Sequence, residues 1–453
     1  MPSWRHPLRR TALAILGAAA ATALLASGCT ANVNGGAYDD LSKKETITFW
    51  HGWSQPNEVN AINANIRAFE RLHPNITVKS VGNVTDDTIN QALRAGGDSA
   101  PDVVSSFSTD KVGLYCASGL WTDLDPFLAK SGIDKAKTFT APTLKYTAYR
   151  GKQCSLPLLG DALGLYYNVD MFKKAGIARP PRTFSEFKAD AEKLTVRKGD
   201  GYRQLGFMPD YHGYATTPTN YLGQWSPTYL DARGRSVLAK GSAVTDMLTY
   251  QRGLVQALGG YDRLEKYRTT FGDEYSTQNA FHVQKVAMQM DGEWRTVNLE
   301  QDRNVRFHWA TAPMPVPDDQ ADQYGKGYAT GTTIGIAHSS RKQNAAWQFV
   351  KFLTTNTKAL VSFANAIHNV PTTYASLKSP DLDKSPTFRT FVRIAANPRS
   401  STLPPTLNGS QFALTLSDFA YRVESGKVPV ARIREGLKEV DHQIDLDNLQ
   451  AEM

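Results

Sequence analysis

The chain has 453 residues, which is enough for more than one domain, since a domain commonly takes about 100–200 residues. Its 41% hydrophobic and 10% aromatic content is ordinary for a globular protein and argues against extended disorder. The net charge is +8, but no run of five or more lysines and arginines occurs, so no nucleic-acid-binding patch is expected.

Residues 1–28 have the features of a signal peptide. Arg5, Arg9 and Arg10 precede a small, alanine-rich apolar stretch that is too short for a comfortable membrane-spanning helix. Loss of these three arginines leaves a net charge of +5. The letters LASGC resemble a lipobox and end at Cys29, which is therefore predicted to carry acyl chains that anchor the protein to the membrane. An ordinary secretory signal is the alternative, and both Sec and twin-arginine export remain open.

The cysteine count agrees with export. Three cysteines are present, and lipidation of Cys29 leaves the pair Cys116 and Cys154. An exported protein folds in an oxidising compartment, so a disulfide between these two is predicted. Two free buried thiols are the alternative.

After a polar, glycine-containing tether over 30–44, strands and helices alternate, which predicts an α/β protein. Apolar runs predict strands at 46–50, 76–81, 101–107, 162–167, 286–290 and 332–337. Helical spacing predicts helices at 59–72, 86–95, 171–175, 185–194, 244–258, 275–283, 343–353, 387–396, 411–423 and 430–443, with Ser185 as the N-cap of its helix. No internal repeat or low-complexity tract is present.

Six segments of the chain carry a family resemblance. They are ITFWHGW from Ile47, PDVV from Pro101, the stretch 160–187, VAMQMDGEW from Val286, GYATGTTIGI from Gly327 and NAAWQFVKFLT from Asn344. In this order they resemble the extracellular solute-binding proteins of bacterial ABC importers, in the carbohydrate-binding group. The resemblance extends from about Ile47 to Asp445.

This resemblance implies a two-lobed, periplasmic-binding-protein-like α/β fold with a hinge and a ligand cleft between the lobes. The expected division is a signal peptide at 1–28, a lipidated tether at 29–44, lobe 1 at 45–155 plus 318–366, and lobe 2 at 156–317 plus 367–453. The lobes would close on a sugar or oligosaccharide, and the closed form would dock on the permease. A monomer, held by its lipid anchor on the extracytoplasmic face of the membrane, is expected.

A sugar site needs aromatic faces for the pyranose rings and fixed polar groups for the hydroxyls. Trp53 follows the first strand, where ligands bind in open α/β sheets, while Trp50 is more typical of the core. The resemblance implies a stacking role for Trp294, with Asp161 bonding sugar hydroxyls and Glu293 as a solvated or supporting carboxylate. The other candidates are Ser108, Asp110, Tyr211, Trp225, Gly331, Asn408 and Phe412; for Ser108 and Asp110, helix capping at Lys111 is the alternative.

Enzyme signals are poor. The sequence has no HExxH, no GxSxG and no P-loop, and its nine histidines include no pair at helical spacing, so no catalytic residues, cofactor or metal are expected. Two alternatives remain. The letters FWH also occur in binding proteins for polyol phosphates such as glycerol 3-phosphate, although none of the candidate site residues is basic. A secreted glycoside hydrolase would use Asp161 and Glu293 as its two carboxyl groups.

Overall fold

The computed structural model describes residues 39–274 and 276–452. The expected signal peptide, Cys29 and most of the tether lie outside these residues. The last part of the tether is described, and Asp39 packs on the folded unit: its carboxylate accepts hydrogen bonds from the backbone N–H groups of Asn344 (2.6 Å) and Ala345 (2.9 Å). No helix within the described ranges is long and apolar enough to span a bilayer.

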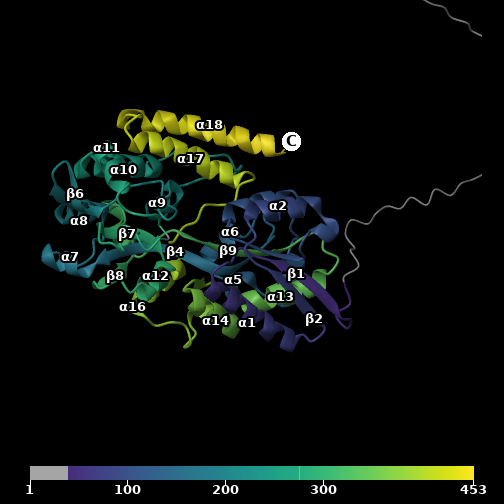
Figure 1. Ribbon diagram of the computed structural model, residues 1–453. Coiled ribbons are helices and arrows are strands. Elements are labelled where there is room, and N and C mark those ends of the chain that lie inside the picture. The colour runs from purple at the N-terminus through teal and green to yellow at the C-terminus, as the bar shows by residue number, and fades with distance from the viewer. Residues whose placement is uncertain (1–38, 275, 453) are drawn as a thin grey trace, which may run out of the picture. The chain divides into compact units, whose positions relative to one another are not determined.

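One strand, β4 (Leu156–Asn168), connects the two halves of the sheet. Its first part pairs with β9 (Ala329–Ile336) as far as Ala162, and from Leu163 onward it pairs with β7 (Val286–Gly292) and β8 (Trp309–Ala312). Figure 1 shows β4 between the elements around β1 and those around β7. Because one strand belongs to both halves, the fold has two lobes that meet along β4.

The first lobe has the strand order β2-β1-β3-β9-β4. Its further strands are β1 (Glu45–Trp50), β2 (Ile76–Val81) and β3 (Val103–Ser106), and β1 runs parallel to both of its neighbours. Its longer helices include α1 (Pro56–Leu72), α2 (Asp86–Ala95), α13 (Gln343–Thr355) and α14 (Thr357–Ile367). Helix α1 begins at a Gln55–Glu58 capping box and buries Ile62, Ile66 and Phe69, the face that its apolar spacing predicts.

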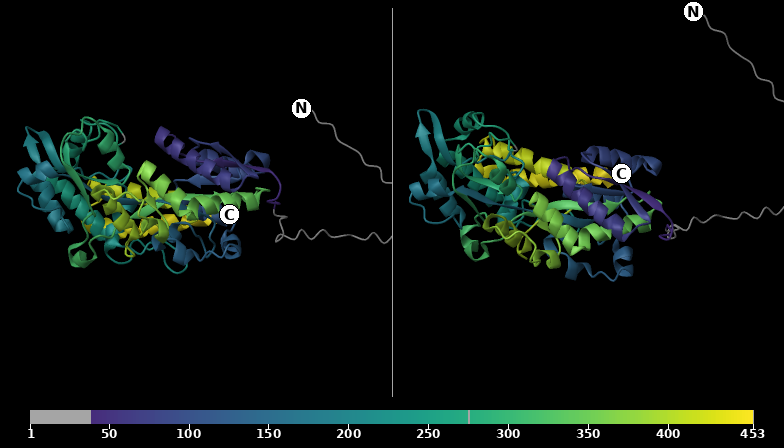
Figure 2. Two further views of the ribbon diagram at one scale, coloured as in Figure 1. Left: turned by 90° about the horizontal axis from the view of Figure 1, so that it is seen from below. Right: turned by 60° about the horizontal axis from the view of Figure 1, so that its bottom comes forward.

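Short helices fill the rest of this lobe: α3 (Val112–Ala117), α4 (Asp125–Lys130), α5 (Lys135–Thr138) and α6 (Ala141–Tyr146). Near the crossing lie β10 (Val370–Pro371), which pairs with β4, and α15 (Tyr374–Leu377). Both views in Figure 2 show the purple elements at the start of the described chain apart from the teal elements of the other half.

The second lobe continues the sheet as β4-β7-β6-β5, with β8 paired to β4. Its remaining strands are β5 (Val196–Lys198) and β6 (Gly201–Phe207). Its helices are α7 (Val169–Lys174), α8 (Phe184–Leu194), α9 (Pro218–Trp225), α10 (Ala243–Leu258), α11 (Tyr261–Arg268), α12 (Arg295–Gln301), α16 (Pro386–Ala396), α17 (Gly409–Glu424) and α18 (Ile433–Glu452). In Figure 1, α17 and α18 lie side by side.

Most predicted elements are confirmed within a few residues, and three details are wrong. The N-cap of α8 is Thr183, whose hydroxyl accepts from the Glu186 N–H, while Ser185 donates to Asp318 instead. Described residues 276–283 form turns rather than a helix. The strand predicted at 286–290 runs on through Asp291 and Gly292.

The predicted disulfide is confirmed. Cys116, in α3, bonds to Cys154, which lies just before β4, and their Cα atoms are 5.5 Å apart. Both half-cystines pack in a small apolar cluster with Tyr115 and Trp121, separate from the main core. The bond therefore fastens a region of short helices to the start of the shared strand.

Replacing both cysteines by serine should lower the free energy of unfolding by up to about 4 kcal/mol. The reason is that the bond closes a loop with a sequence separation of 38 residues, which restricts the unfolded chain. Urea unfolding of the Cys116→Ser/Cys154→Ser variant measures the loss. A reducing agent should cause the same loss of stability in the wild type and have no effect on the variant. Equal urea midpoints for the oxidised wild type and the variant would contradict the prediction.

Candidate ligand-binding cleft

A cleft of about 520 Å³ opens where β4 passes from one half of the sheet to the other. It is lined by Gly52, Trp53, Ser54, Gln55, Asn57, Glu58, Phe107, Asp161, Tyr214, Trp294, Val297, Asn298, Gln301, Thr332, Ile367 and Asn369. Such a volume is in the range of small-molecule sites. None of these lining residues is a lysine or an arginine.

The polar centre of the cleft is a carboxyl pair joined by one amide. Asn369 donates from Nδ2 to Asp161 Oδ1 (2.5 Å) and to Glu293 Oε1 (2.7 Å). Glu293 also accepts from the Ala162 N–H through Oε2, at 2.9 Å. Glu293 is fully buried, whereas Asp161 is partly exposed and lines the cleft. Asp161 is therefore the member of the pair that can meet a ligand, and Glu293 and Asn369 position it.

Burial controls the charge of this pair. It raises the pKa of Asp161 to about 6, and it raises the pKa of Glu293 well above its usual range, with the nearby Asp161 carboxylate adding to the shift. Hydrogen bonds from Asn369 and from the Ala162 N–H oppose the shift of Glu293. A protonated carboxyl both donates and accepts, which suits the dual character of a sugar hydroxyl.

Two aromatic rings form one wall of the cleft. Trp294 begins α12 and is half-buried, and its ring meets that of Tyr214 edge to face, with centroids 5.9 Å apart. The indole lies over Gly292, where an added Cβ would come within 2.1 Å of the ring, so a glycine is required there. Tyr214 is 55% exposed. The wall therefore presents an apolar surface that a ligand can cover.

Phe107 also lines the cleft and follows β3. Its ring is 45% exposed and packs over Gly52, where an added Cβ would lie 2.4 Å from it. Trp53 contacts Phe107 and Phe363 edge to face, at centroid distances of 5.8 and 4.9 Å. Since Trp53 is only 2% exposed, its main contribution is to hold Phe107 in place.

The Tyr214 loop is fixed by a chain of charged groups. Both oxygens of the Glu274 carboxylate accept backbone hydrogen bonds, from Tyr214 (2.8 Å) and from Ala215 (3.3 Å). The Glu274 carbonyl accepts from Arg295 Nη2, and Arg295 forms a buried ion pair with Asp291 at 2.6 Å. The aromatic wall is thereby tied to the end of β7.

The structure brings three of the sequence-predicted site residues to this cleft: Trp53, Asp161 and Trp294. Gly331 lies beside it, opposite Gly160 in the ladder between β9 and β4. It is a strand residue, and an added Cβ there would meet the Leu159 carbonyl oxygen at 2.2 Å.

The other predicted site residues do not line the cleft. Ser108 donates to Asp86 Oδ2 (2.6 Å), and Asp110 accepts from Ser410 at the start of α17. Asn408 precedes α17 and its N–H donates to Asn448. Within the second lobe, Tyr211 packs on Tyr221, Trp225 stacks on Phe184, and Phe412 meets Tyr229. Their role in ligand binding stays a prediction, and their contacts here are internal.

Sequence reasoning missed Phe107, Tyr214 and Asn369 as cleft residues. The sequence predicts Phe107 as the last residue of a strand, and Tyr214 follows no predicted strand or helix closely enough to mark it as a site residue. Asn369 follows α14 and gave no local signal, because its role arises from two carboxylates far away in the sequence. Glu293 is fully buried, so it is not the solvated carboxylate that was one of its two expected roles, and a supporting role stays a prediction.

Two lobes joined by a shared strand, with an aromatic and polar cleft at the crossing, define a ligand-binding protein of the two-lobed class. Residues 53–359 match the family of bacterial extracellular solute-binding proteins, and the chain belongs to this family. Its members are binding proteins rather than enzymes.

Relatives in sequence include a maltotriose-binding protein of Pyrococcus abyssi, 22% identical over 81% of this chain and 76% of its own length. A maltooligosaccharide ABC transporter solute-binding lipoprotein of Streptococcus pneumoniae is 26% identical, over 82% of this chain and 83% of its own. A multiple sugar-binding protein of Streptococcus mutans is 23% identical, over 76% and 78% respectively.

Solved structures share the fold. The mannotriose-bound structure of the protein CpMnBP1 gives a TM-score of 0.73 at 21% identity and covers 88% of this chain and 100% of that one. The sugar-binding protein MalE of Xanthomonas citri also gives 0.73, at 19% identity, and covers 90% and 98%. At such identities the likeness establishes the two-lobed fold.

Replacing the Asp161 carboxyl by an amide should change how the free energy of unfolding depends on pH. The folded state keeps the Asp161 proton up to about pH 6, whereas the unfolded chain loses it near pH 4, so ionisation of this carboxyl lowers the free energy of unfolding as pH rises between these values. The Asp161→Asn variant should therefore gain stability relative to the wild type over this window, by on the order of 1–3 kcal/mol. Urea unfolding at several pH values measures the difference; a difference independent of pH would contradict the assignment.

Proposed function

We propose that this protein is the substrate-binding subunit of an ABC importer, that it captures a sugar or oligosaccharide in the cleft at β4, and that it delivers the sugar to the permease. The main evidence is the lining of the cleft. It combines the exposed rings of Phe107 and Tyr214 and the ring of Trp294 with the polar side chains of Asp161 and Asn369. Stacked rings bind the C–H faces of pyranoses, and the carboxyl and amide bond the hydroxyls. The names of relatives that bind maltotriose, maltooligosaccharides and multiple sugars support this assignment.

A polyol phosphate fits this cleft less well. A phosphate group calls for arginine, lysine or an open helix N-terminus, and the lining residues include Glu58 and Asp161 but no basic side chain. A glycoside hydrolase is also disfavoured, because Glu293 is fully buried and bonded to the Ala162 N–H. Only one carboxyl of the expected pair reaches the cleft, while glycoside hydrolysis commonly uses two.

Export, lipidation at Cys29 and location on the extracytoplasmic face of the membrane belong to the same proposal. The lipobox-like motif and the name of the pneumococcal relative as a lipoprotein support them. We also propose that the protein is a monomer, with the lobe boundaries expected from its sequence. Its lobes would close about a hinge before the protein docks on the permease.

A thermal-shift screen followed by calorimetry tests the function directly. Maltose- and mannose-based mono- and oligosaccharides and glycerol 3-phosphate form the panel. A sugar at 100 times its dissociation constant should stabilise the protein by about 2.7 kcal/mol. Stabilisation by glycerol 3-phosphate alone, or by no compound of a broad sugar panel, would overturn the carbohydrate assignment.

Trp294→Ala should weaken sugar binding by roughly 2–4 kcal/mol, as the loss of an aromatic anchor does, with a smaller effect on stability because the ring is only half-buried. Calorimetry and urea unfolding of the same preparation measure the two quantities.

Trp225→Ala is the matched control for this prediction. Trp225 is also half-buried in the second lobe, but it stacks on Phe184 at a centroid distance of 4.8 Å and does not line the cleft. Its truncation should lower stability and leave affinity unchanged. The opposite pattern, with Trp294→Ala unfolding the protein and the folded remainder binding normally, would place Trp294 in the core.

A further inference from the structure

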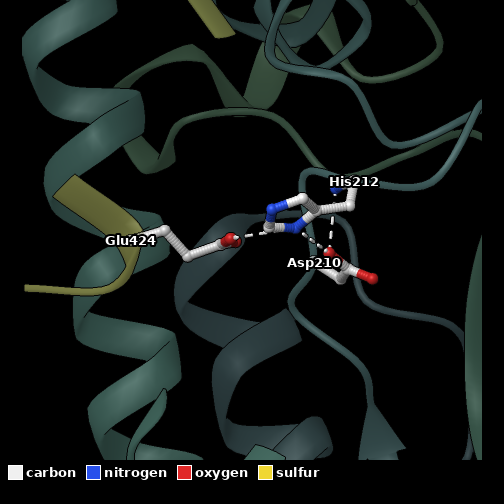
Figure 3. Close-up of side chains that lie close together, drawn as sticks. All are labelled: Asp210, His212 and Glu424. Atoms are coloured by element: carbon white, nitrogen blue, oxygen red, sulfur yellow. Dashed lines mark hydrogen bonds and ion pairs between the residues drawn. The ribbon is translucent and has the colours of Figure 1, made fainter. Parts of the chain in front are cut away.

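Three potential metal ligands meet in the second lobe, outside the lining of the cleft. Asp210 and His212 belong to the loop after β6, and Glu424 is the last residue of α17. One ligand atom from each lies within 4.8 Å of the others, and no other group of three or more such side chains occurs in the part of the chain that the structure describes. Figure 3 shows the Glu424 carboxylate pointing toward the imidazole ring of His212, with Asp210 beside the same ring.

The distances suit a small divalent ion. His212 Nδ1 lies 2.7 Å from Asp210 Oδ1 and 3.9 Å from Glu424 Oε2. Tetrahedral zinc, with bonds of about 2.0–2.1 Å, places its ligand atoms about 3.3 Å apart, a value between these two distances. Since the three ligand atoms lie within 4.8 Å of one another, modest side-chain shifts would bring them into coordination.

Glu424 supplies an independent observation. Its side chain is 1% exposed, and both of its hydrogen bonds end on Oε1, from the Tyr211 N–H (3.2 Å) and from Gln251 Nε2 (2.6 Å). Oε2 faces His212 at a distance too long for a hydrogen bond, and no described residue donates to it. A cation bound at Oε2 would offset the desolvation of the buried Glu424 side chain.

The surrounding charge favours a cation as well. Two guanidinium groups lie nearby: Arg268, with Nε 3.5 Å from Asp210 Oδ2 and its own ion pair to Glu265 at 2.5 Å, and Arg252, whose Nη1 donates to the Glu424 backbone carbonyl at 2.9 Å. When ionised, the carboxylates of Asp210, Glu265 and Glu424 outnumber these two guanidinium groups by one charge. The His212 side chain is 33% exposed, so an ion can enter from solvent.

We propose that His212 Nδ1, an oxygen of Asp210 and Oε2 of Glu424 form a binding site for a divalent transition-metal ion, with zinc as the best fit. Zinc takes imidazole and carboxylate ligands and leaves its fourth position to water when three protein ligands are present. In the metal-free protein the proton on Nδ1 holds the hydrogen bond to Asp210, and the ion replaces that proton.

The site is independent of the sugar cleft, because none of its three residues lines that cleft. The metal would join the loop that carries Tyr214 to the end of α17. Local spacing could not indicate this site, because Asp210 and His212 are two residues apart and the third ligand comes from a distant helix.

The test is calorimetric titration of zinc chloride into the full chain after removal of metals by a chelator. One ion per chain is expected, with a micromolar or tighter dissociation constant, and His212→Ala and Glu424→Gln should each weaken binding at least 10-fold. Anomalous diffraction at the zinc edge should place the ion about 2.0–2.2 Å from His212 Nδ1 and from the two carboxylates.

His308→Ala is the matched control, since His308 Nδ1 also contacts a carboxylate, Asp170 Oδ1 at 3.0 Å, without a third ligand. This variant should bind zinc like the wild type. The proposal is overturned if the wild type binds no zinc at 100 times protein concentration, or if folded His212→Ala binds it as tightly as the wild type. Circular dichroism confirms that each variant is folded.

Discussion

The shared strand β4 is the constraint on which the rest of the structure depends. Its hydrogen bonds pass from β9 to β7 between Ala162 and Leu163, so two separately packed lobes meet along a single extended segment. Asp161 lies two residues before the first β7-paired residue, Leu163, and is one of only two β4 residues that are not buried. A ligand bound to Asp161 would therefore lie at the junction of the lobes, where the proposed hinge closure would act on it.

The chemistry of the cleft follows from burial at this crossing. Asp161 and Glu293 are held together by Asn369, and their raised pKa values reflect the cost of placing two carboxylates in a poorly solvated site. The network leaves one of them exposed to a ligand and uses the other as support. The flanking rings supply contact area without charge, which favours a neutral, hydroxyl-rich ligand over a phosphate.

The loop after β6 links this cleft to the proposed metal site. Glu274 holds the loop at the Tyr214 backbone, and Glu424 lies against the same loop at His212 and accepts from the Tyr211 N–H. A segment without regular structure is thus positioned by carboxylates from two other parts of the lobe. Such fixing explains how an exposed aromatic ring can be held ready for a ligand at little entropic cost on binding.

Elements and their order could be predicted from the sequence, because apolar periodicity is a local property. Strands β1 and β2 and helices α1 and α2 agree with that periodicity, and the disulfide agrees with the cysteine count. Three of the predicted site residues, Trp53, Asp161 and Trp294, lie in the lining of the cleft, and their contact with a ligand stays a prediction. Asn369, Phe107 and the Asp210–His212–Glu424 group could not be foreseen, since each depends on contacts between residues far apart in the chain. Aromatic residues of the kind that line sugar sites also include Tyr211, Trp225 and Phe412. In the folded protein their rings pack against neighbouring rings within the second lobe. Residue type and spacing determine what a segment can become, whereas the direction a side chain faces is decided by what packs against it.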